Sequence, residues 1–516
     1  MKTFYKNYSL SVLLILGISI INTSCQQKTK EKQEGKNKKD SRPNIIILYA
    51  DDLGYGDLSC YGATNVATPN IDKLAENGLR FTDAHSTAAT CSPSRYSLLT
   101  GIYGFRKKAG ILSGDAPLLI SPKTPTLPSM LQKSGYKTGV VGKWHLGLGS
   151  GPLDWNKEIK PGPLEIGFDY SFLIPATGDR VPSVYVENHH VVGLDSLDPI
   201  KVDFKNPIDA SPKAYENPEL LRYASDRQHS EAIINGVGRI GYMSGGNNAR
   251  WKDEEFPDLL TNKASAFIDR NKEQPFFLYY SFHDIHVPRL PNPRFKGATK
   301  MGPRGDAIAQ MDWCVGEIVK QLEDLGIADN TLILFSSDNG PVLNDGYEDQ
   351  SVELIGNHKP SGPFRGGKYS AYEAGTRMPT IAYWPNKIKK GLSNALLSQI
   401  DLYASFASLV GIKLQDGEAP DSQNLVDAWL GKSPKGRTFL VEESLVTSLR
   451  KENWKYIPPT NKKTNHWLPQ KGIEGGYQNT PQLYDLENDV KELNNLAALK
   501  PELVDELKKV LKEIIN

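Results

Sequence analysis

Two long apolar runs in the chain each stop abruptly at acidic and amide residues. The first, in "RPNIIILYADDLGYGD", ends at Asp51 and Asp52. The second, in "NTLILFSSDNGP", runs over 331–335 and leads to Asp338 and Asn339. Neither run alternates between apolar and polar residues, which is typical of β-strands buried on both faces. Because ligands in an open parallel sheet lie beyond the carboxyl ends of the strands, we expect both acidic groups to face one crevice.

Further strands and helices alternate along the chain. Strands are predicted at 137–145, 275–286 and 378–385, and helices at 68–81, 126–136, 259–272, 308–326 and 396–411. This alternation favours an α/β sandwich built on a large mixed, mostly parallel sheet.

Two segments depart from this rhythm. Residues 150–255 are rich in Pro, Gly, Asp and aromatic residues, as expected of a long insertion that shapes a pocket rim. After about Lys435, short strand-like pieces precede an amphipathic helix that begins near Pro501. We therefore predict a catalytic domain over 42–434 and a smaller α+β subdomain over 435–516.

The N-terminus has the layout of an export signal. An apolar run over 10–21 follows two lysines and is too short to span a bilayer comfortably. The following "NTSC" ends at Cys25 and resembles the bacterial lipobox, which implies a signal over 1–24 and lipidation of Cys25; ordinary cleavage near Ser24 is the alternative. Residues 25–41 are charged and Lys-rich, as in a solvated tether. We expect an exported protein, lipid-anchored at the outer membrane and facing either the periplasm or the cell surface.

Charge and cysteine content narrow the range of functions. The 516 residues include 61 Lys plus Arg and 60 Asp plus Glu, so the chain has no global basic field that would hold nucleic acid. If Cys25 carries lipid, Cys60, Cys91 and Cys314 form an odd set, and at least one stays unpaired. A bridge between Cys60 and Cys314 stays open.

The acidic groups favour a hard metal ion. Asp51 and Asp52 would repel each other strongly at a buried strand end without a counter-charge. An all-oxygen set that also includes Asp338 and Asn339 suits Ca²⁺ or Mg²⁺ better than zinc. Taken singly, each pair could instead cap a helix or form a turn.

The sequence "AATCSPSRYSLLTG" over 88–101 places Cys91 near a helix start, because Pro93 fits a first helical turn. Backbone N–H groups and Arg95 would favour negative charge there, as in an activated thiolate. No Cys-His-Asn signature accompanies it, and a buried structural cysteine is the alternative.

The string C-S-P-S-R, followed by "YSLLTG", resembles the CxPSR signature of formylglycine-dependent sulfatases without departure. The resemblance extends over nearly the whole mature chain, through "VVGKWHLG", "PFFLYYSFHDIHVP", "LFSSDNG", "FRGGKYSAYEAGTRMP" and "LYDLENDVKELNNLA". Several motifs in the family's order are far more specific than any one of them.

The resemblance implies an alkaline phosphatase-like fold and a sulfatase. A sulfatase-maturing enzyme would oxidise Cys91 to formylglycine (3-oxoalanine), whose hydrate attacks the ester sulfur and takes the sulfate as a covalent intermediate. The second hydroxyl of the hydrate then loses its proton and expels sulfate. One ion, Ca²⁺ in preference to Mg²⁺, would be held by Asp51, Asp52, residue 91, Asp338 and Asn339.

The resemblance also implies roles for the other polar residues. Arg95 would steady the hydrate, Lys143 and Lys368 would bind sulfate oxygens, His145 would face the formylglycine, and His286 would protonate the leaving alcohol. His283, the neighbour of His286 in "FHDIHVP", is given no role. Lys143 and His145 are two apart on a predicted strand end, so we expect their side chains on one face.

The expected substrate is a sulfated polysaccharide or its oligosaccharides, of algal galactan or ulvan type or a glycosaminoglycan. Arg180, His189 and His190, in the insertion, are candidate sugar contacts; Arg180 could instead form a loop salt bridge. Two other functions compete: a phosphate or phosphonate ester hydrolase of the alkaline phosphatase superfamily, and a lipoprotein that binds sulfated glycans without cleaving them.

Overall fold

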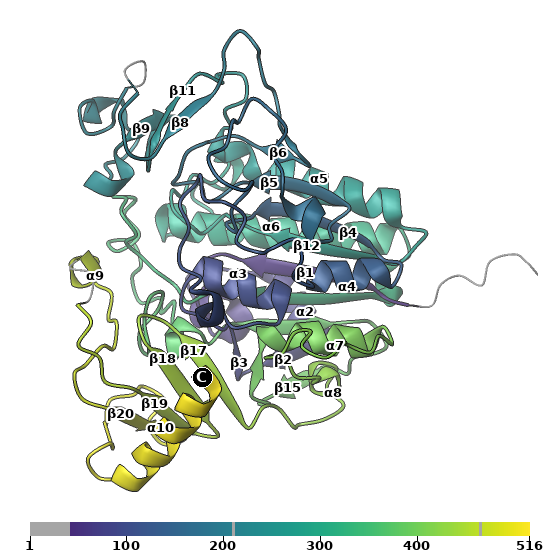
Figure 1. Cartoon of the computed structure of the whole chain (residues 1–516), viewed down its shortest axis with the longest axis vertical. Coiled ribbons are helices and arrows are strands. Elements are labelled where there is room, and N and C mark those ends of the chain that lie inside the picture. Colours follow the sequence, from purple (N-terminus) through teal and green to yellow (C-terminus); the bar gives the residue numbers. More distant parts are fainter. Residues whose placement is uncertain (1–41, 209–211, 464–466) are drawn as a thin grey trace, which may run out of the picture. The chain divides into compact units, whose positions relative to one another are not determined.

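A ten-stranded sheet runs through the protein in the order β15-β2-β14-β13-β1-β12-β4-β5-β6-β7 (Figure 1). The computed structural model describes residues 42–208, 212–463 and 467–516, so the predicted signal, Cys25 and the tether lie outside the described residues. The strands are β1 (Asn44–Ala50), β2 (Leu79–Phe81), β4 (Lys137–Lys143), β5 (Tyr170–Ile174), β6 (Val186–Glu187), β7 (His190–Val191), β12 (Phe276–Ser281), β13 (Thr331–Ser337), β14 (Thr380–Tyr383) and β15 (Gly391–Ser393).

The centre of this sheet is parallel and its flanks are mixed. β1 pairs in parallel with both β12 and β13, β12 with β4, and β4 with β5. β14 runs antiparallel to β13, and β6 antiparallel to β5. The expectation of a large mixed, mostly parallel sheet is therefore confirmed.

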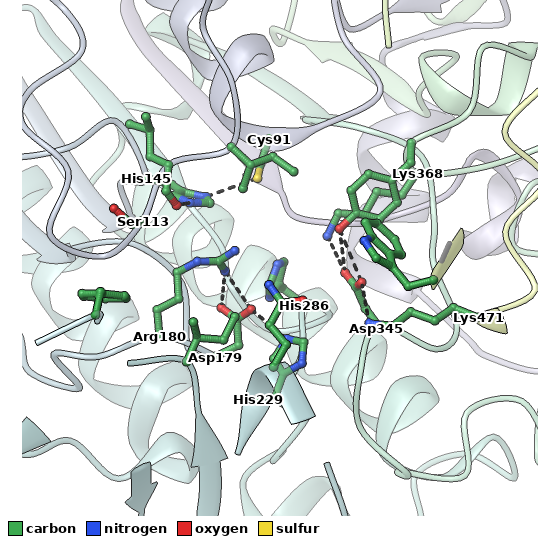
Figure 2. A pocket seen from close by; sticks show the side chains of 17 residues that line it. Cys91, Ser113, His145, Asp179, Arg180, His229, His286, Asp345, Lys368 and Lys471 are labelled. Carbon is green, nitrogen blue, oxygen red and sulfur yellow. Dashed lines mark hydrogen bonds and ion pairs between the residues drawn. The ribbon is translucent and has the colours of Figure 1, made fainter. Parts of the chain in front are cut away.

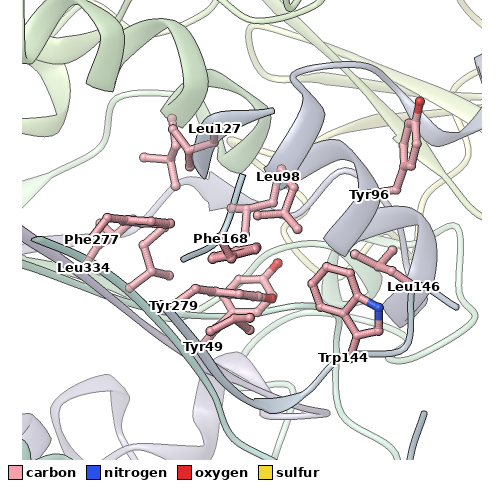
Figure 3. Packing of buried hydrophobic residues seen from close by; sticks show 14 of the residues in the cluster. Tyr49, Tyr96, Leu98, Leu127, Trp144, Leu146, Phe168, Phe277, Tyr279 and Leu334 are labelled. Atoms are coloured by element: carbon pink, nitrogen blue, oxygen red, sulfur yellow. The ribbon is translucent and has the colours of Figure 1, made fainter. Parts of the chain in front are cut away.

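Helices cover both faces of the sheet. These helices are α2 (Pro69–Asn77), α3 (Cys91–Thr100), α4 (Leu127–Lys133), α5 (Phe256–Asn271), α6 (Gly302–Asp324), α7 (Leu402–Leu409) and α8 (Val426–Trp429). Two further helices, α9 (Trp467–Gln470) and α10 (Pro501–Ile515), belong to the C-terminal region. Ile45, Ile47 and Tyr49 of β1 join a core with α3, α4 and α7, part of which Figure 3 shows. The alternate residues Ile46 and Leu48 join a second core with α2, α5 and α6. Because successive strand residues point to opposite faces, one apolar run supplies both layers.

Two predicted helices include residues that form strands in the structure. The helix predicted at 68–81 ends at Asn77, and after Gly78 the chain enters β2, where Leu79 and Phe81 are buried and Arg80 is less so. The helix predicted at 396–411 starts only at Leu402, because Leu397–Ser398 forms strand β16 beside β3 (Ala84–His85). In both places strand pairing wins over helix propensity.

The insertion between β5 and α5 contains two small two-stranded sheets. β8 (Lys201–Asp203) pairs with β11 (Tyr242–Ser244), and β9 (Ala232–Ile234) with β10 (Val237–Arg239). Both pairs are antiparallel and separate from the main sheet, which gives the insertion a framework of its own.

The C-terminal region forms a separate antiparallel sheet. Its strands are β17 (Phe439–Glu443), β18 (Thr447–Lys451), β19 (Trp454–Ile457) and β20 (Gln482–Asp485), and α10 packs on them through Leu507 and Leu511. The strand-like pieces in the sequence, at 437–444, 454–459 and 481–489, correspond to β17, β19 and β20, whereas β18 has no counterpart among them. At the end of β17, the backbone of Glu443 exchanges hydrogen bonds with Thr87 and Ala89, each 2.8 Å long. The sheet thereby braces the segment that leads to Cys91.

Cys60, Cys91 and Cys314 are all free thiols, so the bridge between Cys60 and Cys314 that the sequence left open does not form. Cys314 is buried inside α6, whereas Cys60 precedes α2. Among the described residues, no helix is both long and apolar enough to cross a membrane.

Candidate active site

The carboxyl ends of β1 and β13 bring four of the predicted metal ligands together. One carboxylate oxygen each of Asp51, Asp52 and Asp338 lies within 4.8 Å of the other two, and all three side chains are buried. Asn339 joins them, since its Nδ2 donates to Asp52 Oδ1 over 2.7 Å. The parallel register sets Ala50 opposite Ser337, so the residues that follow both strands emerge at the same level.

Two oxygens of this group have no hydrogen-bond partner among the described residues, although Arg95 Nη2 lies 3.8 Å from Asp51 Oδ1. Asp51 Oδ1 and Asn339 Oδ1 are both fully buried and accept no hydrogen bond there. Leaving a buried polar atom unpaired costs about 1–3 kcal/mol. A divalent cation would satisfy both, and an all-oxygen donor set fits Ca²⁺ or Mg²⁺. The residues present therefore fit a single hard metal ion.

Three buried cations surround the carboxylates. The shortest pairs are Lys143 Nζ to Asp51 Oδ2 at 2.6 Å, Arg95 Nη2 to Asp338 Oδ2 at 2.7 Å, and Lys368 Nζ to Asp52 Oδ2 at 2.9 Å. Burial raises the pKa of Asp51 even though Lys143 opposes the shift. Burial alone would also raise the pKa of Asp338, but Arg95, Lys143 and Lys368 together outweigh burial, and the pKa is lowered. Three carboxyl groups and three basic side chains thus lie together at the base of the site.

Cys91 is the first residue of α3, where Pro93 occupies the first turn. The thiol is buried, and burial raises its pKa in spite of Lys143 and Lys368. A reactive thiolate needs a lowered pKa, so the activated-thiolate interpretation of Cys91 is not supported. The Sγ atom instead marks the place where an oxygen of formylglycine would stand.

His145 faces Cys91 from the end of β4. Its Nδ1 lies 3.2 Å from Cys91 Sγ, and its Nε2 lies 2.9 Å from the carbonyl oxygen of Leu112. β4 ends at Lys143 and His145 has a φ of +52°, so a left-handed turn, not the strand alternation we expected, directs the imidazole to the site. Burial, followed by Lys143, lowers the pKa of His145 well below its ordinary value.

His286 approaches the same group from the loop after β12. Its Nδ1 lies 2.6 Å from the carbonyl oxygen of Val287, which makes Nδ1 the donor and leaves Nε2 facing Asp52 Oδ2 at 3.9 Å. Burial and then Lys143 and Lys368 lower the pKa of His286. His283 lies beside His286, with a ring nitrogen within 4.8 Å of a carboxylate oxygen of Asp51, but its Nε2 is engaged by a 2.6 Å hydrogen bond from the backbone N–H of Gly178.

A cavity of about 360 Å³ opens over these groups (Figure 2). Its lining includes four of the predicted catalytic residues, Cys91, His145, His286 and Lys368, and also Arg180, a predicted sugar contact. Asp51, Asp52, Arg95, Lys143, Asp338 and Asn339 are buried beneath it and are absent from its lining. A ligand in the cavity would therefore meet residue 91 and the two histidines directly.

One wall of the cavity comes from the insertion (Figure 2). Arg180 Nη1 lies 2.6 Å from Asp179 Oδ1, so the loop salt bridge weighed for Arg180 exists, and yet Arg180 lines the cavity. His229 lies between two carboxylates, with Nε2 3.4 Å from Asp179 and Nδ1 2.6 Å from Asp226. Burial opposes protonation of His229, but these carboxylates raise its pKa. Sequence patterns gave no signal for His229, whereas Asp179 stands next to the predicted Arg180.

The opposite wall comes from the loop around Lys368 and from the C-terminal region. Asp345 Oδ2 accepts from Lys368 Nζ over 2.9 Å, and Lys471 Nζ lies 2.9 Å from Asp226 Oδ2. Trp467 also lines the cavity, with its ring edge-on to Tyr369 at 5.1 Å. No motif in the sequence marked Asp345, Trp467 or Lys471, because Trp467 and Lys471 follow Asp345 by more than 100 positions in the chain.

His189 and His190 lie outside this cavity. His190 belongs to β7, the outermost strand of the large sheet on that side, and is exposed. His189 pairs instead with Glu165, with 3.0 Å between Nε2 and the carboxylate. The structure therefore does not bring these two candidate sugar contacts to the site, because the hairpin of β6 and β7 carries them to the sheet edge.

The fold and this constellation define a hydrolase of the alkaline phosphatase-like architecture with a buried metal cradle under its pocket. The sequence model of the Sulfatase family matches residues 43–412. The chain is 50% identical over 514 residues to the N-acetylgalactosamine-6-O-sulfatase of Bacteroides thetaiotaomicron, covering 99% of both chains. It is 32% identical over 430 residues to human arylsulfatase H, covering 77% of this chain and 74% of that one.

Solved structures agree. A sulfatase structure from work on glycosaminoglycan metabolism by Bacteroides thetaiotaomicron superposes with a TM-score of 0.90 at 50% identity, covering 92% of this chain and all of that one. The PsFucS1 sulfatase from Pseudoalteromonas gives a TM-score of 0.67 at 25% identity over 96% of this chain and 93% of that one.

The chain belongs to the sulfatase family, in its type I, formylglycine-dependent branch, and resembles the bacterial polysaccharide sulfatases. It is an enzyme that hydrolyses sulfate esters, and the competing phosphate-ester and non-catalytic interpretations are set aside. Members of the family use formylglycine and a divalent metal, in agreement with the CxPSR segment and the acidic cradle described above.

Proposed function

We propose that this sulfatase removes the 6-O-sulfate from N-acetylgalactosamine residues of glycosaminoglycan-type glycans. The observation that carries the proposal is the 50% identity to the N-acetylgalactosamine-6-O-sulfatase, which spans 99% of both chains. Of the substrates considered from the sequence, this favours glycosaminoglycans over algal galactans and ulvans.

We assign Ca²⁺ as the metal, held by Asp51, Asp52, Asp338 and Asn339 together with residue 91 as formylglycine. Bound there, the ion would polarise a sulfate oxygen and the nucleophilic oxygen. The oxygens of Asp51 and Asn339 that lack a hydrogen-bond partner among the described residues support the assignment, since Ca²⁺ accepts six to eight oxygen ligands in flexible geometry.

The protein's own residues then orient the ester and move protons. Lys368 reaches the cavity and supplies positive charge for sulfate oxygens, while Lys143 acts from beneath through Asp51. Arg95, fixed by Asp338, holds that carboxylate in place below residue 91. These charges lie in a buried, low-dielectric site, where they act far more strongly than in water.

Two histidines have complementary proton roles in this proposal. His145 donates from Nε2 to Leu112, so its Nδ1 is an acceptor that faces residue 91 and can take a proton from the hydrate. His286 donates from Nδ1 to Val287, so its Nε2 faces the ester. An anionic sulfate ester beside His286 would raise its low pKa and ready it to protonate the leaving alcohol.

For the sugar, we propose contacts from Arg180 and His229, which line the cavity opposite Lys368. Because Arg180 and His229 both pair with Asp179, N–H donors and a carboxylate acceptor lie side by side. Together they can donate a hydrogen bond to a sugar hydroxyl and accept one from it.

Sulfate release from three isomers tests the proposal. The purified enzyme, matured and supplied with Ca²⁺, is given N-acetylgalactosamine 6-sulfate, N-acetylgalactosamine 4-sulfate and N-acetylglucosamine 6-sulfate. We expect kcat/KM for the first to exceed the other two by at least about 10³-fold, because unmet buried hydrogen bonds at a polar site penalise the wrong isomer strongly. Equal rates on the 4-sulfate or on the glucosamine would refute the assignment.

Maturation and location complete the proposal. Since the Cys91 side chain is buried in the folded chain, we infer that a sulfatase-maturing enzyme converts it before folding is complete. We also propose lipidation at Cys25 and anchoring to the outer membrane, on the signal-like N-terminus alone. Cys25→Ala should move the protein from the membrane fraction to the soluble fraction of the native host.

A further inference from the structure

A second cavity of about 350 Å³ lies next to the catalytic one, and the two share Lys368 and Lys471. Both volumes lie within the range of ligand pockets, about 300–1,000 Å³. Because two side chains line both cavities, the two cavities are direct neighbours.

The segment 467–474 forms the ridge between the cavities. Trp467 and Lys471 line the catalytic cavity, whereas Lys471, Gly472, Ile473 and Glu474 line the second. The chain turns from one to the other at Gly472, which has a φ of +69° that favours glycine.

Two residues of the ridge, Lys471 and Glu474, contact the loops that carry the site. Lys471 pairs with Asp226 of the insertion at 2.9 Å. The carbonyl oxygen of Glu474 accepts from Ser370 Oγ over 2.7 Å, two residues beyond Lys368. The ridge is therefore a built wall of the site.

The lining of the second cavity suits a sugar ring. Pro341, Val342, Leu343, Val352 and Pro360 offer C–H surface, and Ser361, Lys368, Lys471 and Glu474 are polar. A pyranose has the same mixture, with C–H faces and a rim of hydroxyls. The ammonium of Lys471 has three N–H donors, and its ion pair with Asp226 uses one of them. The side chain of Lys471 is 10% exposed.

We propose that the second cavity binds the sugar glycosidically linked to the sulfated residue, with Lys471 donating to an oxygen of that sugar at the junction. This inference rests on the proposed function, since it takes the sulfated sugar to occupy the first cavity. Binding of the neighbouring sugar in the second cavity makes the enzyme selective for a sulfated residue that is still attached to that sugar.

The test compares a monosaccharide with a disaccharide. The probes are N-acetylgalactosamine 6-sulfate and the disaccharide in which this residue is linked to a hexuronic acid. Val352→Trp fills the second cavity from a residue that lines it and not the first. Val192→Trp is the matched control, because Val192 is an exposed valine, 38% accessible, that lines neither cavity.

We expect the ratio of kcat/KM for disaccharide over monosaccharide to fall at least about tenfold in Val352→Trp and Lys471→Met, and to stay near the wild-type value in Val192→Trp. An unchanged ratio in folded Val352→Trp, checked by its melting temperature, overturns the inference while the wild-type activity upholds the proposed function. If the wild type releases sulfate from neither probe, the proposed function fails and the inference falls with it.

Discussion

The Nδ1 atom of His145 lies 3.2 Å from Sγ of Cys91, and the hydrogen bond from its Nε2 to Leu112 fixes which nitrogen faces that atom. The low pKa of His145, caused first by burial, keeps the imidazole neutral near pH 7. A neutral acceptor beside residue 91 is what a base for the formylglycine hydrate requires.

His145→Ala should therefore lower kcat by about 10²–10⁴-fold with a small change in KM, because a general base acts on the chemical step. Steady-state kinetics on N-acetylgalactosamine 6-sulfate measures both. His190→Ala is the control, since His190 is exposed on β7 outside the cavity. A rise in KM without loss of kcat would assign His145 to binding instead.

The partnerless oxygen of Asn339 makes this residue a sensitive probe of the metal. Asn339→Ala should raise the Ca²⁺ concentration for half-maximal activity at least about tenfold, because it removes one ligand oxygen. It should also reduce the increase in melting temperature that Ca²⁺ gives the wild type. Asn77→Ala, at the exposed end of α2, is the matched control. If Ca²⁺ stabilises wild type and Asn339→Ala equally, Asn339 is not a ligand.

Arg180 and His190 were both candidate sugar contacts, and the structure separates them. Arg180→Ala should lower kcat/KM for N-acetylgalactosamine 6-sulfate by about 10–100-fold, since a charge-assisted hydrogen bond contributes about 1.5–3 kcal/mol. The rate on 4-nitrophenyl sulfate, which lacks the sugar, should change far less. His190→Ala should alter neither. Equal losses on both substrates for Arg180→Ala would place Arg180 at the sulfate and not at the sugar.

His85 links the strand before Cys91 to the C-terminal sheet. Its Nε2 lies 2.8 Å from Asp83 and its Nδ1 3.0 Å from Glu442. Burial opposes protonation, but the two hydrogen-bonded carboxylates prevail and raise the pKa of His85. A raised folded-state pKa gives stability that is fully present below the unfolded value of about 6.5 and is lost as pH rises through the folded value.

His85→Gln should therefore lower the free energy of unfolding by about 1–3 kcal/mol at pH 6. This loss should shrink as the pH is raised toward 9. Denaturant melts of wild type and variant across that range measure the difference. His190→Gln should show no such trend. A loss that stays constant with pH would mean that His85 is not held protonated.

Local sequence patterns predicted the parts of the site that lie at strand ends and in short motifs. The apolar runs of β1 and β13 place Asp51 and Asp338 because parallel pairing aligns their ends. Cys91 was found because its helix start has its own signature. Lys471 and His229 were missed because only tertiary folding brings the C-terminal ridge and the insertion to the pocket. The local pattern predicts a helix at Leu79–Phe81 because the strand that pairs with it, β14, lies about 300 residues further along the chain.

We propose that residue 91 of the working enzyme is an aldehyde held over the acidic cradle. Mass spectrometry of the peptide that carries residue 91, in enzyme purified from its native host with sulfatase activity, tests this most directly. We predict that the peptide mass is lowered because an aldehyde replaces the cysteine thiol. The fraction of the peptide that has this lower mass should rise in proportion to the specific activity of the enzyme. A fully active enzyme whose Cys91 is entirely an unmodified thiol would contradict it.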